Sequence, residues 1–203
     1  MNWDARYATD DFLFGTEPAA FLTREAGRIP PNSRVLCVAD GEGRNSVHLA
    51  RLGHRVTAFD PSQNAVSKAR RLAAETGVEV AFNVAGIDDW DWSQPMDVIA
   101  AIFIQFLGPV DRAALFATFR ESLQPGGLLL LHGYAPRQVD YGTGGPPFAE
   151  NMYTLRMLEE AFGGWDVSLG ADYDAVIEEG RGHSGQSGLI DFIARKPMGQ
   201  PAP

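Results

Sequence analysis

The sequence predicts an α/β fold built on a doubly wound sheet, mostly parallel, with helices on both faces and an antiparallel hairpin at the C-terminal end. Strand-like and helix-like segments alternate five times through short connections, which is typical of parallel sheets. The strand-like segments are continuous apolar runs, as expected for strands buried on both faces. Two later segments alternate apolar and polar residues around a glycine-rich stretch, and these predict the hairpin.

The first half of the chain supplies the first three strands. A helix is predicted from apolar positions between Phe21 and Ile29, with Thr16 as its N-cap and Pro18 in its first turn. Glycines close the next two helices, at Gly53 and Gly77. The predicted strands and helices are: strands at 35–38, 55–59 and 78–84, and helices at 44–52 and 62–75.

The second half continues the pattern after a loop at 85–95. A long Gly/Pro-rich loop at 135–150 interrupts it, and such a loop can serve as a lid. The predicted elements are: strands at 98–103, 128–131, 165–173 and 189–195, a helix starting at Pro109, and a helix from Thr154 to Phe162.

The length of 203 residues suits one domain, expected at 1–196, with 197–203 as a disordered tail. The formal net charge of −9, without a Lys/Arg cluster, argues against nucleic acid and anionic membranes as partners. Cys37 is the single cysteine, so no disulfide framework can form. No apolar stretch approaches the ~20 residues of a membrane span. We therefore expect a cytoplasmic protein, monomeric or weakly dimeric.

Residues 33–45 are the centre of the predicted fold, because they read as strand, small-residue turn and helix start. Gly41 and Gly43 would let the backbone approach a ligand, and the helix start offers N–H groups to an anion. Asp60 ends the following strand and suits the hydroxyls of a ribose. Ser46 stands at the third glycine position of a dinucleotide fingerprint, which favours a mononucleoside over a nicotinamide or flavin dinucleotide.

The run from Val35 to Asn45 resembles motif I of class I S-adenosylmethionine (SAM)-dependent methyltransferases, although Cys37 and Ala39 replace the commoner acid and glycine. The string Gly-Glu-Gly-Arg-Asn at 41–45 is similar to the branch that contains tellurite-resistance and thiopurine methyltransferases. The resemblance extends from Trp3 to Lys196. It implies a Rossmann-like sheet and methyl transfer from SAM to a small-molecule nucleophile, with a thiol, selenium or tellurium species among the candidates and S-adenosylhomocysteine as product.

The resemblance also implies which residues hold SAM. Asp60 would bind the ribose, Pro61, Gly86 and Ile87 would lie near the adenine, and the turn of motif I would contact the methionine part. The complete implied set is: Ala39, Asp40, Gly41, Gly43, Asn45, Asp60, Pro61, Gly86, Ile87, Ile102 and Phe103.

Three residues on the acceptor side are candidates for catalysis: Tyr7, His132 and His183. Tyr7 and Phe14 could stabilise the sulfonium through cation–π attraction. His183 is either a general base on the hairpin or a surface histidine on a glycine-rich loop. Gln105 and Tyr134 are further acceptor-side candidates.

The segment 1–15 is either a lid that orders over the donor or a fixed edge of the core. Asp88, Asp89 and Asp91 carry no neighbouring His or Cys, so we expect no metal site there. His48 and His54 are interpreted as structural. A protein that binds SAM or its product without transferring the methyl group remains the alternative function, while a nicotinamide oxidoreductase is disfavoured by Ser46.

Overall fold

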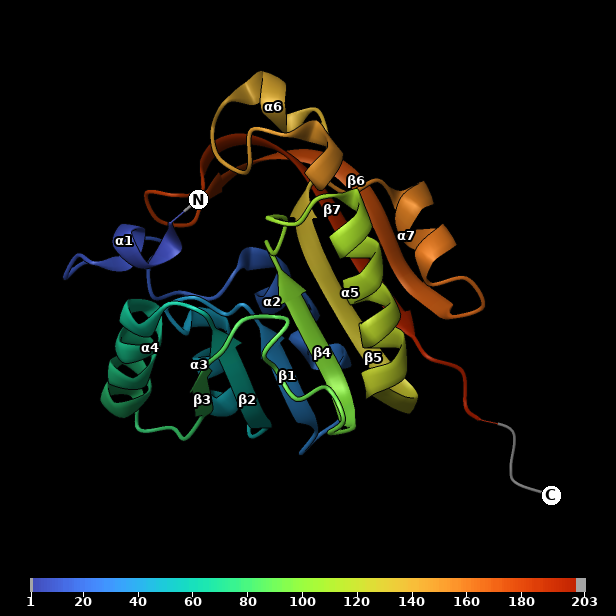
Figure 1. Cartoon of the computed structure of the whole chain (residues 1–203), viewed down its shortest axis with the longest axis horizontal. Helices are drawn as coiled ribbons and strands as arrows, with labels where there is room; N and C mark the ends of the chain where they lie inside the picture. The colour runs from blue at the N-terminus through green and yellow to red at the C-terminus, as the bar shows by residue number, and fades with distance from the viewer. Residues whose placement is uncertain (1, 200–203) are drawn as a thin grey trace. The chain divides into compact units, whose positions relative to one another are not determined.

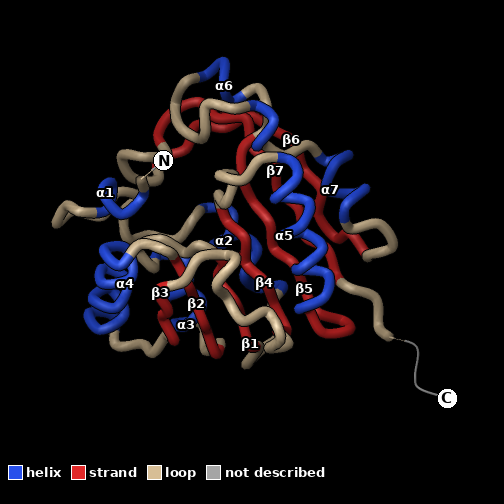
Figure 2. Tube along the Cα trace, viewed as in Figure 1, coloured by secondary structure: helices blue, strands red, loops and turns tan. Residues whose placement is uncertain are grey.

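The computed structural model describes residues 2–199, which form two compact units. The first unit contains residues 2–90 and 176–186, and the second contains 91–175 and 187–199. Figures 1 and 2 show the helices and strands along the chain. No helix among the described residues is both long enough and apolar enough to cross a membrane.

Seven strands of the described chain form a mixed sheet in the order β3-β2-β1-β4-β5-β7-β6. The pairs β1/β2, β2/β3 and β4/β5 are parallel, and β5/β7 is antiparallel. The prediction of a Rossmann-like, mostly parallel sheet with a C-terminal antiparallel pair is therefore confirmed. The strands are: β1 Arg34–Val38, β2 Arg55–Asp60, β3 Ala81–Val84, β4 Met96–Ile102, β5 Leu123–Tyr134, β6 Asp166–Glu178 and β7 Ser184–Arg195.

The first unit places the predicted helices around β1, β2 and β3. Ser62 caps α4 through a 3.1 Å hydrogen bond from Ala65 N to its Oγ, and Gly77 ends α4 in the left-handed region, as predicted. The helices of this unit are: α1 Trp3–Tyr7, α2 Ala20–Glu25 with a 3₁₀ turn η1 at Ala26–Arg28, α3 Arg44–Arg51 and α4 Gln63–Thr76.

The predicted cap of α2 is wrong. The N-cap is Ala19, not Thr16, and no side chain of the cap residue binds the helix. Side chains distant in the sequence replace it: Ala19 N donates to Asn45 Oδ1 at 3.0 Å, and Ala20 N donates to Glu179 Oε1 at 2.9 Å. Because these partners lie 26 and 159 residues away, local pattern could not reveal them.

The second unit contains β4, most of β5 to β7, and four helical segments. Pro109 begins α5 and Thr154 caps α7, as predicted. β5 starts at Leu123 rather than at residue 128, with a register shift between Met96 and Val98 of its partner. The loop predicted at 135–150 contains a short helix. The helical segments are: α5 Pro109–Ser122, α6 Gln138–Tyr141, η2 Ala149–Asn151 and α7 Leu155–Ala161.

The strands of the terminal hairpin are longer than predicted, because β6 and β7 continue to a tight turn at 179–183. The third strand is shorter, beginning at Ala81 rather than Val78. The single domain and the disorder of 197–203 stay predictions. Of the tail, residues 200–203 lie outside the described residues, as does Met1 of the predicted lid.

The start of α3 lies unusually close to α4. A Cβ added to Gly43 would be 2.8 Å from Ala69 Cα and 2.7 Å from Ala69 Cβ. Gly43 also has φ of +89°, a left-handed conformation that L side chains rarely adopt. Small residues on both sides are therefore required for the turn at 39–43 to approach α4.

We predict that Gly43→Ala lowers the free energy of unfolding by about 2–4 kcal/mol, because strain and overlap with the α4 backbone add. Gly53→Ala is the matched control, since Gly53 has φ of +88° and open space around its Cβ position. Urea denaturation of both variants separates the cost of backbone strain from the cost of overlap with α4. Equal losses in the two variants would mean that contact with Ala69 contributes nothing.

Candidate active site

The turn after β1, residues 39–43, has the geometry of an anion-binding or ligand-binding loop. Ala39, Gly41 and Gly43 all have positive φ, at +47°, +63° and +89°. The Asp40 N–H donates to Phe59 O at 3.0 Å, which attaches the turn to β2. Gly43 is the N-cap of α3 and has no side chain to cap the helix. The backbone N–H groups in the first turn of α3 therefore have no side-chain cap.

Asp60 fixes this turn from the end of β2. Its Oδ2 accepts from Gly41 N at 3.0 Å, and its Oδ1 accepts from Ser62 N at 2.9 Å. Each carboxylate oxygen can accept a second hydrogen bond, so Asp60 retains capacity for two ligand hydroxyls. Burial raises the pKa of Asp60 above its ordinary value.

Asp40 is the second carboxyl at this turn, and it accepts a short hydrogen bond from the Ser46 hydroxyl. Removal from water raises the pKa of Asp40 to about 7, with the nearby Asp60 charge adding to the rise. Two carboxyls with raised pKa values lie beside one turn. A bound cation would favour their ionised forms, so the site suits a cation or hydroxyl donors.

The N-terminal segment packs against the same turn. Glu42 Oε2 accepts from Leu13 N at 2.8 Å and from Phe14 N at 3.3 Å, while Glu42 Oε1 forms a buried 2.8 Å ion pair with Lys68 Nζ. Asp4 accepts from the Ser62 hydroxyl at 2.6 Å at the start of α4. The sequence interpretation assigned no role to Glu42. An acid between two glycines of a predicted binding turn was the available signal.

Tyr7 lies against the turn at 39–43, because its hydroxyl oxygen would be 3.0 Å from a Cβ added to Gly41. It is buried, and its ring centroid lies 5.8 Å from that of Trp3 and 6.2 Å from that of Phe14. Burial and the charges of Asp60 and Glu42 raise the pKa of Tyr7 well above its ordinary value. Tyr7 therefore remains a neutral phenol, suited to donating a hydrogen bond and unsuited to acting as a base.

His183 is buried in the hairpin turn, and the surface-histidine interpretation is wrong. Its ring centroid lies 4.4 Å from that of Phe14, and its carbonyl accepts from Glu179 N at 2.7 Å. Phe14 also occupies the space where side chains at Gly180 and Gly182 would stand. The N-terminal segment and the hairpin are therefore packed together within the first unit.

The remaining donor-side candidates of this unit surround the ends of β1 to β3. Asn45 is buried, and its side chain already accepts from Ala19 N, which leaves its backbone for a ligand. Pro61 directly follows β2, while Gly86 and Ile87 follow β3. Trp90 stacks on Phe59 at 4.7 Å between ring centroids and 16° between planes. The sequence interpretation treated Trp90 as part of a loop and missed this aromatic pair.

In the second unit, the candidates Ile102 and Phe103 end β4. Phe103 has φ of +56°, a strained value for a bulky residue, and its ring lies edge-on to His132 at 4.6 Å between centroids. Gln105 binds the backbone of Tyr134 with both ends of its amide, accepting at 2.5 Å and donating at 2.7 Å. These contacts fix the end of β5.

A buried cluster, the His132 cluster, joins β5, β6 and β7 through His132, Tyr173 and Asp191. His132 Nδ1 lies 2.6 Å from Asp191 Oδ1, and the two residues are partners in the β5/β7 register. The Tyr173 hydroxyl lies 3.2 and 3.1 Å from the two Asp191 oxygens. His132 was a sequence candidate, whereas Asp191 and Tyr173 were not. The signal for Asp191 was a single acid inside the apolar run 189–194.

No group of three or more His, Cys, Asp or Glu residues within 2–199 is arranged to hold a metal ion. The geometry of the first unit does fit a nucleoside with a positively charged side arm. Asp60 can accept hydroxyl hydrogens, Phe59 and Trp90 offer aromatic surface, and Asp40 lies at the turn.

We predict that Asp40→Asn stabilises the folded protein above pH 7. The unfolded Asp40 ionises near pH 3.8, but the folded one ionises only near pH 7, so wild-type stability falls as pH rises through this window. Asparagine does not ionise, and the expected gain is about 1–2 kcal/mol at pH 8 after allowing for partial exposure. Chemical denaturation at pH 5 and pH 8 measures it. A gain that is the same at both pH values would contradict a raised pKa.

Comparisons with known proteins agree with this geometry. Residues 35–127 match the family model described as "Methyltransferase domain". A ubiquinone biosynthesis O-methyltransferase of Xanthomonas campestris pv. campestris is 36% identical over 102 residues, which are 50% of this chain and 43% of that protein. A homologous protein of Xylella fastidiosa is 35% identical over 106 residues. The match thus spans less than half the length of these relatives.

Solved structures share the fold across nearly the whole chain. TehB from Haemophilus influenzae has a TM-score of 0.70 at 19% identity, covering 96% of this chain and 65% of that one. N-methyltransferase NodS from Bradyrhizobium japonicum, in complex with S-adenosylhomocysteine, has a TM-score of 0.70 at 13% identity and covers 96% of each chain. Residues 35–127 are thus similar to methyltransferase domains, and the described chain has the fold of solved methyltransferase structures.

Proposed function

We propose that the chain is an active methyltransferase that transfers a methyl group from SAM to a hydroxyl group of a small molecule. The observation that carries the donor assignment is Asp60, whose carboxylate orders the Gly41 turn and retains acceptor capacity. When bound, SAM supplies an electrophilic methyl group on a positively charged sulfur. Asp60 would hold the ribose hydroxyls, and the amides of residues 39–43 would hold the carboxylate of the methionine part.

The remaining donor-side set keeps the roles that the resemblance implies. Asp40 would face the positively charged arm of the donor, Pro61, Gly86 and Ile87 would lie beside the adenine with Trp90, and Ile102 and Phe103 would contact the sulfur side. Tyr7 would donate a hydrogen bond rather than remove a proton. The segment 2–15 would close over the donor, supported by the bond from Leu13 N to Glu42 and by the bond that Asp4 accepts from Ser62.

The His132 cluster supports the proposal of a hydroxyl acceptor. Asp191 beside Nδ1 favours the tautomer with hydrogen on Nδ1, which makes Nε2 the basic nitrogen of the ring. The Asp191 charge would also stabilise the imidazolium formed when Nε2 takes a proton. A hydroxyl must lose its proton during methylation, whereas a thiol, selenium or tellurium nucleophile can react already ionised. The name of the Xanthomonas relatives, an O-methyltransferase, supports the same class of acceptor.

We also propose a role for His183, the class of partner, the location and the oligomeric state. His183, buried against Phe14, would position the N-terminal segment. The net charge of −9 supports a small-molecule partner over nucleic acid or a membrane. We also propose a cytoplasmic protein that is a monomer or a weak homodimer. The alternative function is binding of SAM or S-adenosylhomocysteine without transfer.

We predict that Asp60→Asn weakens binding of SAM and S-adenosylhomocysteine by about 1–3 kcal/mol, because a neutral amide replaces the charged acceptor of the ribose hydroxyls. Calorimetry gives both affinities. Asp166→Asn, an exposed acid of β6, is the matched control and should bind as the wild type does. A folded Asp60→Asn protein with wild-type affinity would remove Asp60 from the donor site.

We predict that His132→Gln slows methylation of phenols and alcohols by about 10²–10⁴-fold, with a smaller effect on thiols measured above their pKa. Asp191→Asn should give a similar selective loss, since it changes the favoured tautomer. The measurement is product formation from radiolabelled SAM across pH, with His54→Gln, another buried histidine, as the control. The same loss for phenols and thiols would show positioning instead of proton transfer. SAM binding without product from any acceptor would favour the alternative function.

A further inference from the structure

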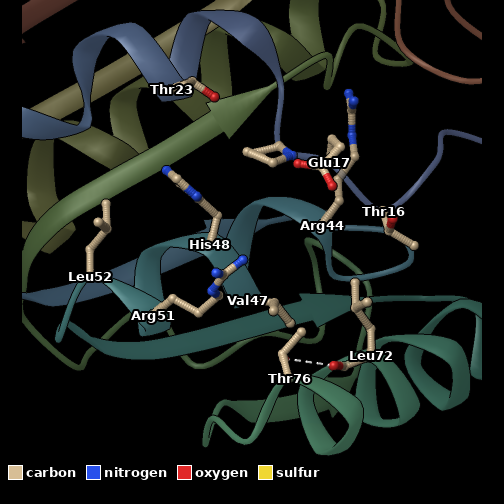
Figure 3. Close-up of a pocket in the computed structure, with 11 residues that line it drawn as sticks. Thr16, Glu17, Thr23, Arg44, Val47, His48, Arg51, Leu52, Leu72 and Thr76 are labelled. Atoms are coloured by element: carbon tan, nitrogen blue, oxygen red, sulfur yellow. Dashed lines mark hydrogen bonds between the residues drawn. The ribbon is translucent and has the colours of Figure 1, made fainter.

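The first unit contains a cavity of about 410 Å³ that none of the proposed donor-site residues lines. It lies among the segment 16–18, Thr23 of α2, helix α3 and the C-terminal half of α4 (Figure 3). Its size is within the range of small-molecule sites. The residues that line it are: Thr16, Glu17, Pro18, Thr23, Arg44, Val47, His48, Arg51, Leu52, Leu72 and Thr76.

Helix α3 gives this cavity a basic wall. Arg44, His48 and Arg51 are spaced i, i+4 and i+7, so their side chains share one face of the helix. Figure 3 shows all three around the cavity, with Glu17 as the acid that lines it. Glu179 already pairs with Arg44, so Arg51 and protonated His48 are the cations left to an anionic ligand, against the carboxylate of Glu17.

Arg44 is the buried end of that wall. Its Nη2 donates to Glu179 Oε2 at 2.7 Å, and the two side chains are 7% and 8% exposed. Its Nη1 is also buried and has no hydrogen-bond partner within residues 2–199. A guanidinium N–H group left unsatisfied in the interior is costly. Because Nη1 is closed to solvent, an oxyanion in the cavity would reach it only through a shift of the Arg44 side chain.

The other walls of the cavity are apolar or carry hydroxyl groups. Val47, Leu72 and Leu52 form an apolar surface, and the Thr76 hydroxyl already donates to Leu72 O at 2.7 Å. Thr16 and Thr23 add two further hydroxyls. Arg51 is exposed and forms no ion pair within the described part of the chain, so it remains available to a ligand. A charged head with an apolar body matches this lining.

We propose that the cavity lined by Arg44, His48 and Arg51 binds a small organic anion through its carboxylate or phosphate group, separately from the donor site. Arg44 directly follows Gly43, the last residue of the donor-side turn. An anion that holds Arg44 also holds the start of α3, whose N–H groups belong to that turn. Occupation of the cavity therefore changes the affinity of the donor, and by linkage the donor changes the affinity of the anion.

The pH dependence of this site is set by His48. Burial and the charge of Arg51 lower the pKa of His48, while Glu17 opposes them. Arg44 also lies on α3, whereas α2 contributes Thr23, and α4 contributes Leu72 and Thr76. A bound anion would favour protonated His48, so affinity should increase as pH falls through the lowered pKa of His48.

The test uses phenyl phosphate and benzoate as probes, with inorganic sulfate as the head group alone, titrated into the full chain at constant ionic strength without SAM. Amide chemical shifts of α3 and Thr23 report binding by NMR. We expect saturable shifts with dissociation constants of about 1 mM or lower for one aromatic probe, and weaker binding of sulfate. The aromatic probe that binds identifies the head group as phosphate or carboxylate.

Arg51→Gln should weaken that binding at least fivefold, and Arg28→Gln, an exposed arginine of η1, should leave it unchanged. Arg51 is exposed, so this variant is expected to fold. Sulfate keeps its charge between pH 5.5 and 8, so its tighter binding at the lower pH should be lost in His48→Gln. Linear shifts that do not saturate, or equal affinities in wild type and Arg51→Gln, would overturn the site. Because no SAM is present, these outcomes do not depend on the proposed transfer activity.

Discussion

The Asp60 carboxylate holds together the part of the first unit on which the remaining contacts depend. By accepting from Gly41 N and Ser62 N, it connects the turn after β1 to the beginning of α4. Ser62 in turn caps α4 and donates to Asp4, which attaches α1 to the same point. Removing one negative charge here would release a strand end, a helix start and the N-terminal segment together.

Two buried ion pairs explain why the turn reads Gly-Glu-Gly-Arg. Glu42 binds Lys68 and the N–H groups of Leu13 and Phe14, and Arg44 binds Glu179, which accepts from Ala20 N. Each carboxylate thus neutralises a buried cation. Glu42 also satisfies backbone donors of the N-terminal segment, and Glu179 satisfies one at the start of α2. Breaking such a pair on one side leaves an uncompensated buried charge, which is strongly destabilising. Glu42 and Arg44 are therefore structural residues of the turn after β1 and the start of α3.

The features that sequence could predict are those that neighbouring residues determine. Apolar runs, the Ser62 cap and the glycine at the end of α4 are local, and the structure has them where they were expected. The wrong cap of α2 and the missed Asp191 have another cause. Their partners are separated by 159 residues for Ala20 and Glu179, and by 59 for His132 and Asp191. Only the strand order brings such residues together. In the sequence, the one indication of such a pair is an acidic residue within an apolar strand.

The carboxyls at the donor-side turn also bear on discrimination between donor and product. Asp40 and Asp60 both have raised pKa values, caused first by burial. The charge of Asp60 adds to the rise for Asp40, and the charges of Asp4 and Glu42 add to the rise for Asp60. A cation bound beside them would lower both pKa values and so stabilise the ionised pair. SAM carries a sulfonium charge that its demethylated product lacks. Under the proposed function, the two neighbouring carboxyls lower the stability of the protein without ligand, but they favour binding of SAM over its product. Transfer of the methyl group removes the sulfonium charge and so weakens the attraction between the carboxyls and the bound molecule.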